Sequence, residues 1–157
     1  MKPRVYIETS VVSYLVAAPG RDLIIAAHQQ ITREWWTQRR SAFELFASQL
    51  VVDEAGRGDP RFAQSRLTEL STIPLLVLTE DAKTLARDLF VGGPLPEKAA
   101  ADAFHVALAA VSRMDYLLTW NCRHLANAQM QRAIASKCES LGYDPPVICT
   151  PEELMGK

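Results

Sequence analysis

The sequence predicts an α/β fold in which a central parallel sheet is covered by helices on both faces. Short runs of branched apolar residues alternate with longer segments of helical periodicity, an order that is typical of successive βαβ units. The strand-like runs are almost continuously apolar, as in residues 74–78, which suits strands with no polar face. The Pro/Gly segments are too short to be interdomain linkers, so we expect one domain over residues 1–157.

Two kinds of segment follow one another along the chain. Strands are predicted where runs are short and rich in branched apolar residues, and helices where apolar residues recur at helical spacing. The predicted strands are 4–7, 50–53, 75–79, 115–119 and 147–149. The predicted helices are 9–16, 23–48, 60–71, 80–91, 96–114 and 121–141.

Composition and charge restrict the function. The 157 residues are 48% hydrophobic and 22% charged, as in an ordinary globular domain and unlike a disordered chain. The net charge is −1, so no global positive field attracts nucleic acid, and any polyanion must be held locally. The three cysteines are too few for a disulfide framework and lack the paired spacing of a zinc site, which indicates a cytoplasmic location. No run approaches ~18 apolar residues, so we expect no membrane segment.

Acidic residues follow the first two predicted strands, at the sheet edge where open α/β folds bind ligands. Glu8 comes directly after the first strand, and the hydroxyls of Thr9 and Ser10 lead into the next helix. A helix N-cap at Thr9 or Ser10, with Glu8 beside it, explains this segment equally well. Asp53 and Glu54 end the second predicted strand. Alternation places them on opposite sides, so only one should face the site, and we favour Glu54.

Two further polar residues extend this group. Asp102 lies within a segment so apolar that its helix must be largely buried, and a buried carboxylate needs a partner, for which a cation is the natural choice. Asn121 follows the fourth predicted strand, where its amide oxygen can bind a metal directly or through water. A helix N-cap is an equally good interpretation of Asn121, and the two roles are compatible.

Together, Glu8, Glu54, Asp102 and Asn121 form an oxygen-only ligand set at the predicted sheet edge. Such ligands suit Mg²⁺ or Mn²⁺, whose coordination is usually completed by water and substrate phosphates. Without a cation, the clustered carboxylates would repel one another and would repel a polyanion. The sequence therefore predicts chemistry on a phosphodiester that depends on a bound metal ion.

The chain resembles the PIN-domain nucleases, and within them the VapC-like toxins of type II toxin–antitoxin pairs, in residues 5–15, 50–54, 102–109 and 115–124. The order of these four segments carries the resemblance, which covers almost the whole chain. It implies a three-layer fold with a five-stranded parallel sheet in the order 3-2-1-4-5. It also implies a metal-dependent endoribonuclease, in which a metal-activated water attacks phosphorus in RNA, and a small antitoxin protein as partner.

Two positions depart from the pattern of that family. The first acid is usually Asp and here is Glu8, and the fourth is commonly Asp and here is Asn121, so a second metal ion should bind poorly. These departures motivate an alternative function as a catalytically weak PIN-like module that binds RNA or protein. A nucleotide-binding domain is disfavoured because no G-x-G-x-x-G or Walker-type loop follows the first strand.

Polar and basic residues near the strand ends are candidates for substrate binding. Arg57 and Arg123 lie near predicted strand ends, where they are placed to contact phosphate. His105 is interpreted as a hydrogen-bonded core histidine, and His124 lacks the partners of a zinc site. The predicted substrate-binding residues are Thr9, Ser10, Arg57 and Arg123.

Trp35 and Trp36 lie within the long helix predicted over residues 23–48. Adjacent helical side chains diverge by ~100°, so the two indoles should not both point inward. We expect one to pack on the sheet and the other to lie at an interface with an antitoxin or with a second copy of the chain in a homodimer. Base stacking on RNA is the less favoured role for this pair.

Overall fold

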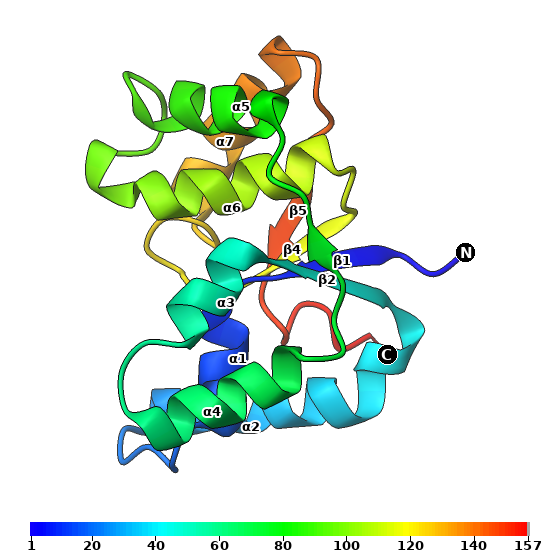
Figure 1. Ribbon diagram of the computed structural model, residues 1–157, viewed down its shortest axis with the longest axis vertical. Coiled ribbons are helices and arrows are strands. Elements are labelled where there is room, and N and C mark those ends of the chain that lie inside the picture. Colours follow the sequence, from blue (N-terminus) through cyan, green and yellow to red (C-terminus); the bar gives the residue numbers. More distant parts are fainter. Residues whose placement is uncertain (157) are drawn as a thin grey trace.

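The sheet has five strands, all parallel to their neighbours. In the computed structural model, which describes residues 1–156, the strands lie in the order β3-β2-β1-β4-β5 (Figure 1). Their bounds are β1 (Arg4–Ile7), β2 (Glu44–Ser48), β3 (Leu75–Leu76), β4 (Tyr116–Leu118) and β5 (Val147–Cys149). This topology confirms the predicted α/β class and the strand order that the resemblance implied.

Helices cover both faces of the sheet, which gives three layers (Figure 1). The chain moves outward from β1 to β3 and then returns to β4 and β5 on the other side of β1. Because crossovers between parallel strands are right-handed, these opposite directions place the first four helices on one face and the last three on the other. The central strand is therefore enclosed on both sides, and Val5, Tyr6 and Ile7 are fully buried.

The helical segments differ in length and type. The α-helices are α1 (Thr9–Val16), α2 (Leu23–Glu34), α3 (Gln49–Ala55), α4 (Pro60–Leu70), α5 (Glu80–Phe90), α6 (Ala100–Val111) and α7 (Ala128–Ser140). A single π-helical turn (Trp35–Arg39) and two 3₁₀ turns (Arg40–Ala42 and Glu97–Ala99) complete the set within residues 1–156. Over the same residues, no helix has both the length and the apolar character needed to cross a bilayer.

The strand order reverses beside β1, and this point positions the candidate site. Ile7 at the end of β1 is level with Leu118 at the end of β4, and the Glu8 N–H donates to the Leu118 carbonyl at 3.0 Å. The carboxyl ends of β1 and β4 are therefore adjacent. Open α/β sheets bind ligands at such a switch point.

The second predicted strand is wrong: residues 50–53 belong to helix α3, and the strand is the preceding segment, β2. Both segments are short apolar runs, and periodicity cannot distinguish a short buried helix from a strand. Ser48 marks the true boundary, because its Oγ accepts a hydrogen bond from the Val51 N–H at 3.3 Å and caps α3. The predicted helix 23–48 accordingly ends early, and its last residues form β2.

The two adjacent tryptophans are both buried, contrary to the prediction. Trp35 is fully buried and Trp36 is 7% exposed. The chain forms a π-helical turn here, in which the Arg40 N–H bonds to the Trp35 carbonyl, so the side-chain directions differ from those of an α-helix. The Trp35 indole donates to the Leu154 carbonyl at 3.2 Å, and the Arg40 guanidinium lies 4.3 Å from the centre of the Trp36 ring. Neither indole is free to form an interface.

Candidate metal centre

Glu8 is a buried carboxylate at the end of β1, with 6% of the residue exposed. Its Oε1 accepts hydrogen bonds from the hydroxyls of Ser10 and Thr119, the latter at 2.6 Å, and its Oε2 accepts from the Ser10 N–H at 3.2 Å. Glu8 itself is thus the N-cap of α1, in place of Thr9 or Ser10. The helix-cap and metal-ligand interpretations of this segment are therefore compatible, because the same residue, Glu8, is both the N-cap and the candidate metal ligand.

Glu54 lies in the last turn of α3 and points toward Glu8. The Thr9 hydroxyl donates to Glu54 Oε1 at 2.7 Å, and His105 Nε2 lies 2.8 Å from the same oxygen. By contrast, Asp53 is exposed and accepts a hydrogen bond from Gln49 at 2.9 Å. Of the two adjacent acids, the geometry places Glu54 beside Glu8 and directs Asp53 to solvent.

His105 connects Glu54 to a chain of buried hydroxyl groups. The imidazole is 1% exposed, and its Nδ1 lies 2.7 Å from the Tyr6 hydroxyl, which lies 2.7 Å from Ser48 Oγ. Burial alone would lower the pKa of His105, but the hydrogen bond with Glu54 and the negative charges around it raise that pKa overall. Burial likewise opposes ionisation of Glu54, but its bonds to His105 and Thr9 outweigh this effect and lower its pKa. The Glu54 carboxylate is therefore held in its charged form.

Asp102 lies in the first turn of α6 and is held by two side chains from the segment after β4. Asn121 Nδ2 donates to its Oδ1 at 3.0 Å, and His124 Nδ1 lies 3.0 Å from its Oδ2. Asn121 Oδ1 accepts the N–H groups of Arg123 at 3.2 Å and of His124 at 3.1 Å. Asn121 thus caps this turn with its oxygen and supports Asp102 with its nitrogen. Helix α7 begins only at Ala128.

The side chains of Glu8, Glu54 and His105 form a compact group that suits a metal ion. One donor atom from each lies within 4.8 Å of the other two, and Asp102 is not part of this tight group. Two carboxylates and an imidazole are common ligands of divalent cations. A bound cation would also offset the repulsion between the two neighbouring carboxylates. The residues present therefore fit a divalent metal ion.

The predicted substrate-binding residues fall into two sets. The hydroxyls of Thr9 and Ser10 donate to the site carboxylates, so they hold Glu54 and Glu8 in place. Arg57 and Arg123 are exposed. Arg57 and Glu54 both line a groove of about 600 Å³ between α1 and α4.

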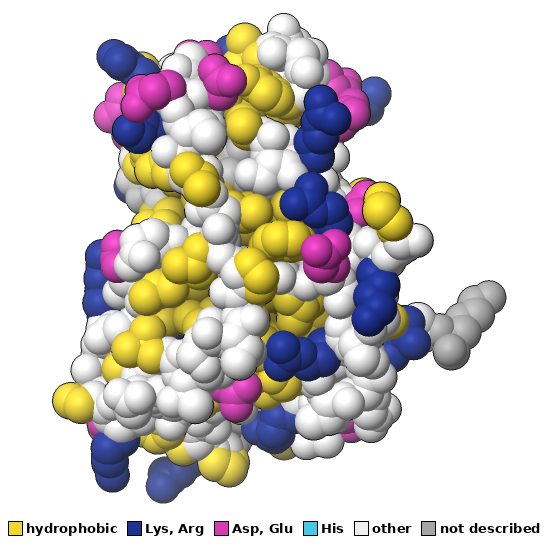
Figure 2. Space-filling model, turned by 45° about the vertical axis from the view of Figure 1, so that its right-hand side comes forward, with side chains coloured by type: hydrophobic (Ala, Val, Ile, Leu, Met, Phe, Trp, Pro, Cys, Tyr) yellow, Lys and Arg dark blue, Asp and Glu magenta, His cyan; other side chains and the backbone are white. Residues whose placement is uncertain are grey.

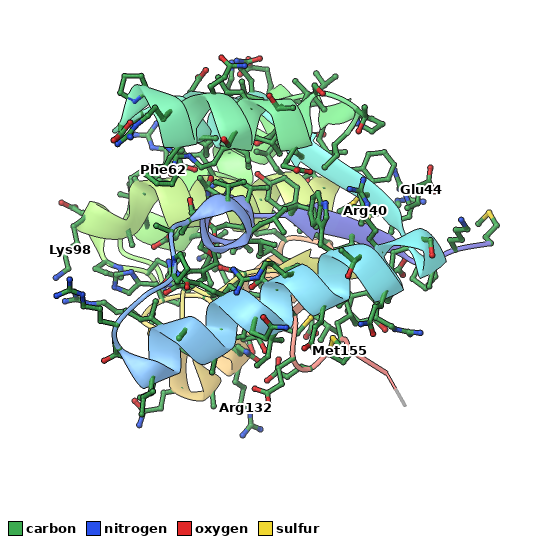
Figure 3. All side chains as sticks on the ribbon, turned by 90° about the horizontal axis from the view of Figure 1, so that it is seen from below. Arg40, Glu44, Phe62, Lys98, Arg132 and Met155 are labelled. Carbon is green, nitrogen blue, oxygen red and sulfur yellow. The ribbon has the colours of Figure 1, made fainter. Side chains whose placement is uncertain are left out.

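The walls of this groove include two aromatic side chains, Tyr14 on α1 and Phe62 on α4. Phe62 lies on the side of α4 that faces α1 (Figure 3). Arg66 also lines the groove and is fixed by hydrogen bonds to the carbonyls of Ala55, at 2.8 Å, and Arg57. The groove therefore combines aromatic surfaces with cations next to a site carboxylate.

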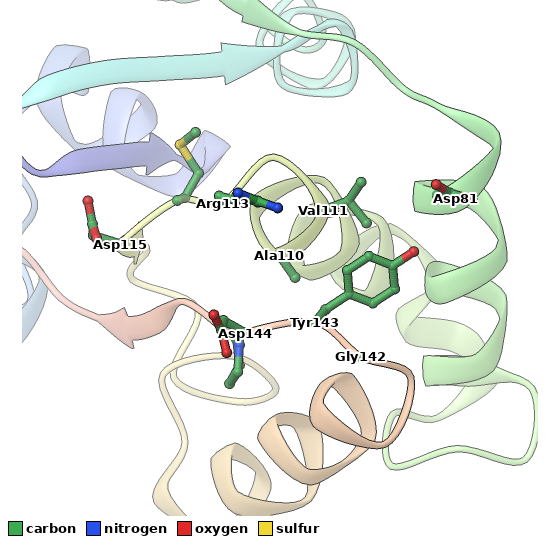
Figure 4. A pocket seen from close by; sticks show the side chains of 10 residues that line it. Asp81, Ala110, Val111, Arg113, Asp115, Gly142, Tyr143 and Asp144 are labelled. Atoms are coloured by element: carbon green, nitrogen blue, oxygen red, sulfur yellow. The ribbon is translucent and has the colours of Figure 1, made fainter.

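A second cleft lies at the opposite edge of the sheet. It has a volume of about 620 Å³ and is lined by Asp81, Arg113, Tyr143 and Asp144, among others (Figure 4). Asp115, also in its lining, directly precedes β4, so the cleft is near the amino ends of the strands. Its acids are exposed, and it contains no group of metal-binding donors comparable to that around Glu8 within residues 1–156.

Three contacts of the site were not predicted from the sequence: His105 with Glu54, His124 with Asp102, and Thr119 with Glu8. The prediction that His105 is a hydrogen-bonded core histidine is correct. A signal existed for His105, which follows Asp102 by three positions and so shares its helical face. Nothing in the sequence indicated the other two contacts, because their partners are 22 and 111 residues away.

Comparison with known proteins shows a shared fold. No family model matches the sequence, and no curated protein matches it. The structure is similar to a chain in the crystal structure of VapBC2 from Rickettsia felis bound to a DNA fragment from their promoter, with a TM-score of 0.58 and 12% sequence identity. The match covers 94% of this chain and 98% of that chain. It confirms the PIN-like fold that the resemblance implied.

Proposed function

We propose that this protein is a metal-dependent endoribonuclease that acts as the toxin of a type II toxin–antitoxin pair. The observation that carries the proposal is the convergence of Glu8 and Glu54 at the switch point of a PIN-like sheet. In this proposal Glu8, Glu54 and Asp102 hold Mg²⁺ or Mn²⁺. Asn121 contributes by fixing Asp102, since its amide nitrogen donates to that carboxylate and its oxygen is engaged by backbone N–H groups.

The protein's own groups would position the metal and the substrate. When bound, a divalent ion neutralises charge on the phosphate and makes a water molecule more acidic. Thr9 fixes Glu54, and Ser10 with Thr119 fixes Glu8, so these carboxylates are oriented before any ligand arrives. Such preorganisation avoids rearrangement during the reaction.

The groove between α1 and α4 is the proposed path of a single-stranded RNA segment. Tyr14 and Phe62 provide surfaces on which bases can stack, and Arg57 lies where it can contact a phosphate. Aromatic stacking combined with cations is a common mode of single-strand binding. Arg123 is exposed and its backbone N–H donates to Asn121 Oδ1, and it is also proposed to contact phosphate.

Two protein partners belong to this proposal. The solved structure of similar fold is VapBC2 bound to promoter DNA, which supports a small antitoxin as one partner. The other is a second copy of this chain. Hydrophobic side chains are gathered across the face that carries β3 (Figure 2), where Leu75, Val77 and Leu78 are 43%, 76% and 43% exposed. This exposed edge, with those three residues, is the proposed homodimer contact.

A catalytically weak binding module is the second candidate. It is favoured by Asn121, whose oxygen accepts two backbone hydrogen bonds and whose side chain brings no charge to the fourth acidic position. RNA binding in the groove without cleavage would distinguish this alternative.

The test is cleavage of single-stranded RNA by the purified protein with Mg²⁺ or Mn²⁺. We expect cleavage that EDTA abolishes and that Asp102→Asn removes, while the matched variant Asp53→Asn retains it. Undiminished cleavage in EDTA would refute the metal mechanism, provided that Asp102→Asn is inactive and so excludes a contaminating nuclease. If Asp53→Asn is inactive and Glu54→Gln is active, the second acid is Asp53.

A further inference from the structure

We propose that His105 is itself a ligand of the metal ion, so that the centre is a mixed carboxylate–imidazole site that prefers Mn²⁺ over Mg²⁺. This inference rests on the proposed metal dependence and specifies which ion the site selects. The observation behind it is that a ring nitrogen of His105 and a carboxylate oxygen from each of Glu8 and Glu54 all lie within 4.8 Å of one another, with Nε2 directed at Glu54 Oε1.

The spacing of Glu54 and His105 suits two ligands of one ion. Glu54 Oε1 and His105 Nε2 are 2.8 Å apart. Neighbouring ligand atoms around an octahedral ion with bonds of about 2.1 Å are separated by about 3.0 Å. An ion can therefore take the position between them with small movements of either side chain.

The outer nitrogen of His105 has the partner that a metal-bound histidine requires. Imidazole ligands usually donate their other N–H to a fixed acceptor, which sets the tautomer and the ring orientation. The Tyr6 hydroxyl, 2.7 Å from Nδ1, can accept a hydrogen bond from Nδ1–H and donate one to Ser48 Oγ. In this tautomer the ring proton is on Nδ1, and the lone pair of Nε2 is free for the metal. Without metal, the opposite tautomer donates Nε2–H to Glu54 and accepts from Tyr6, so both states keep the Tyr6–Ser48 contact.

The fold fixes the imidazole in this place. His105 is 1% exposed on α6, and its ring also packs against Tyr6 with the ring centres 5.7 Å apart. Glu8 at the end of β1 and Glu54 on α3 approach from two other elements. Because the three ligands come from separate, packed elements, the site is rigid enough to discriminate between ions.

The nitrogen ligand decides the selectivity. Mg²⁺ prefers oxygen ligands and retains several waters, whereas Mn²⁺ accepts imidazole more readily. A site made of oxygens alone accepts both ions. A merely positioning role for His105, acting on Glu54 through the hydrogen bond, predicts no direct metal–nitrogen bond, and this bond is the observation that distinguishes the two roles.

The experiment is titration of the metal-free protein with Mn²⁺ and with Mg²⁺ by calorimetry, followed by pulsed electron paramagnetic resonance of the Mn²⁺ form. We expect tighter binding of Mn²⁺ and a directly coupled ¹⁴N nucleus. In His105→Gln the coupling should disappear, and the Mn²⁺ affinity should fall by more than the about 10- to 100-fold that is typical for loss of a residue that only holds a ligand, with a smaller effect on Mg²⁺. His124→Gln is the matched control, because that histidine contacts Asp102 and should leave the coupling unchanged.

Tyr6→Phe provides a second variant in case His105→Gln does not fold. It removes the hydroxyl next to Nδ1 but keeps the imidazole, so the coupling should persist while Mn²⁺ binds more weakly. Mn²⁺ bound without ¹⁴N coupling in the wild-type protein would overturn the ligand role and leave the proposed nuclease intact. Coupled Mn²⁺ in a protein that cleaves no RNA would support the ligand role and refute the nuclease. Absence of any Mn²⁺ binding would overturn both.

Discussion

Replacing Glu54 by Gln tests how the buried hydrogen-bond chain of the site is held together without metal. Gln has nearly the same shape, and its amide oxygen can still accept from Thr9 and from His105. What is lost is the negative charge, which strengthens both bonds, at 2.7 Å and 2.8 Å. What is gained is relief of the repulsion between Glu54 and Glu8, whose oxygens lie within 4.8 Å.

The magnitude follows from these opposing effects. A hydrogen bond to a charged group contributes about 1.5–3 kcal/mol, and a neutral one about 0.5–1.5 kcal/mol, so two weakened bonds cost roughly 2–3 kcal/mol. The relieved repulsion offsets about 1 kcal/mol, because Glu54 is partly exposed and solvent screens its interaction with Glu8. We therefore expect Glu54→Gln to lower the free energy of unfolding by about 1–2 kcal/mol. For a chain of this size, that corresponds to a melting temperature lower by roughly 2–8 °C.

The measurement is urea unfolding in EDTA at pH 6, followed by the fluorescence of the buried tryptophans. Asp53→Asn is the control, because Asp53 is exposed and makes one hydrogen bond to Gln49, so its removal should change stability by less than about 0.5 kcal/mol. If Glu54→Gln is as stable as the wild-type protein or more stable, carboxylate repulsion outweighs the bonds to His105 and Thr9, and the reasoning fails.

Three further predictions concern other groups. The lowered pKa of Glu54 gives stability that is present above pH 4.5 and lost in acid, whereas the raised pKa of His105 gives stability that is present below pH 6.5 and lost as the pH rises. The stability advantage of the metal-free wild-type protein over Glu54→Gln should therefore be largest between pH 4.5 and 6.5. An advantage that does not change with pH would contradict this prediction. Val77→Asp, at an exposed position, should leave folding unchanged but dissociate the homodimer proposed above, as measured by sedimentation. A variant that remains dimeric would exclude the β3 edge as the contact. Asn121→Asp should destabilise the metal-free protein, because it replaces a hydrogen-bond donor to Asp102 with a like charge. Added Mn²⁺ should raise the melting temperature of this variant more than that of the wild-type protein. An equal rise in both proteins would show that the charge at position 121 does not affect binding of the ion.

The sequence was sufficient for the fold class because the alternation of strand-like and helical segments is a local property. It failed at residues 44–53, where two short apolar runs are adjacent and periodicity does not decide which is the strand. Ser48 could have indicated the boundary between the strand and the helix, since serine is a preferred N-cap residue. Glu54 was favoured from the alternation of side chains along a strand, but residues 50–54 are helical, so that argument does not apply to the segment as it folds.

The contacts within the site were harder to predict from the sequence, because they join segments far apart in the chain. Glu54 and His105 are 51 residues apart, and their contact depends on the packing of α3 and α6 against the end of β1. Local reasoning can place a histidine on the same helical face as Asp102, but it cannot show which acid that histidine meets. The prediction for Trp35 and Trp36 failed for a related reason, since a π-helical turn has no clear sequence signal and changes the direction of every side chain in it.

The arrangement around Asn121 bears on how many ions the site can hold. An Asp at this position could accept the same backbone N–H groups and still present a charged oxygen, whereas the amide of Asn121 directs its nitrogen to Asp102. One face of Asp102 is thus occupied by Asn121 and the other by His124, and neither contact brings a second negative charge. Of the three carboxylates proposed to hold the ion, Glu8 and Glu54 lie in the tight group with His105, and Asp102 lies outside that group. Two carboxylates and one imidazole would suit a single divalent ion, with water and substrate phosphate completing its coordination.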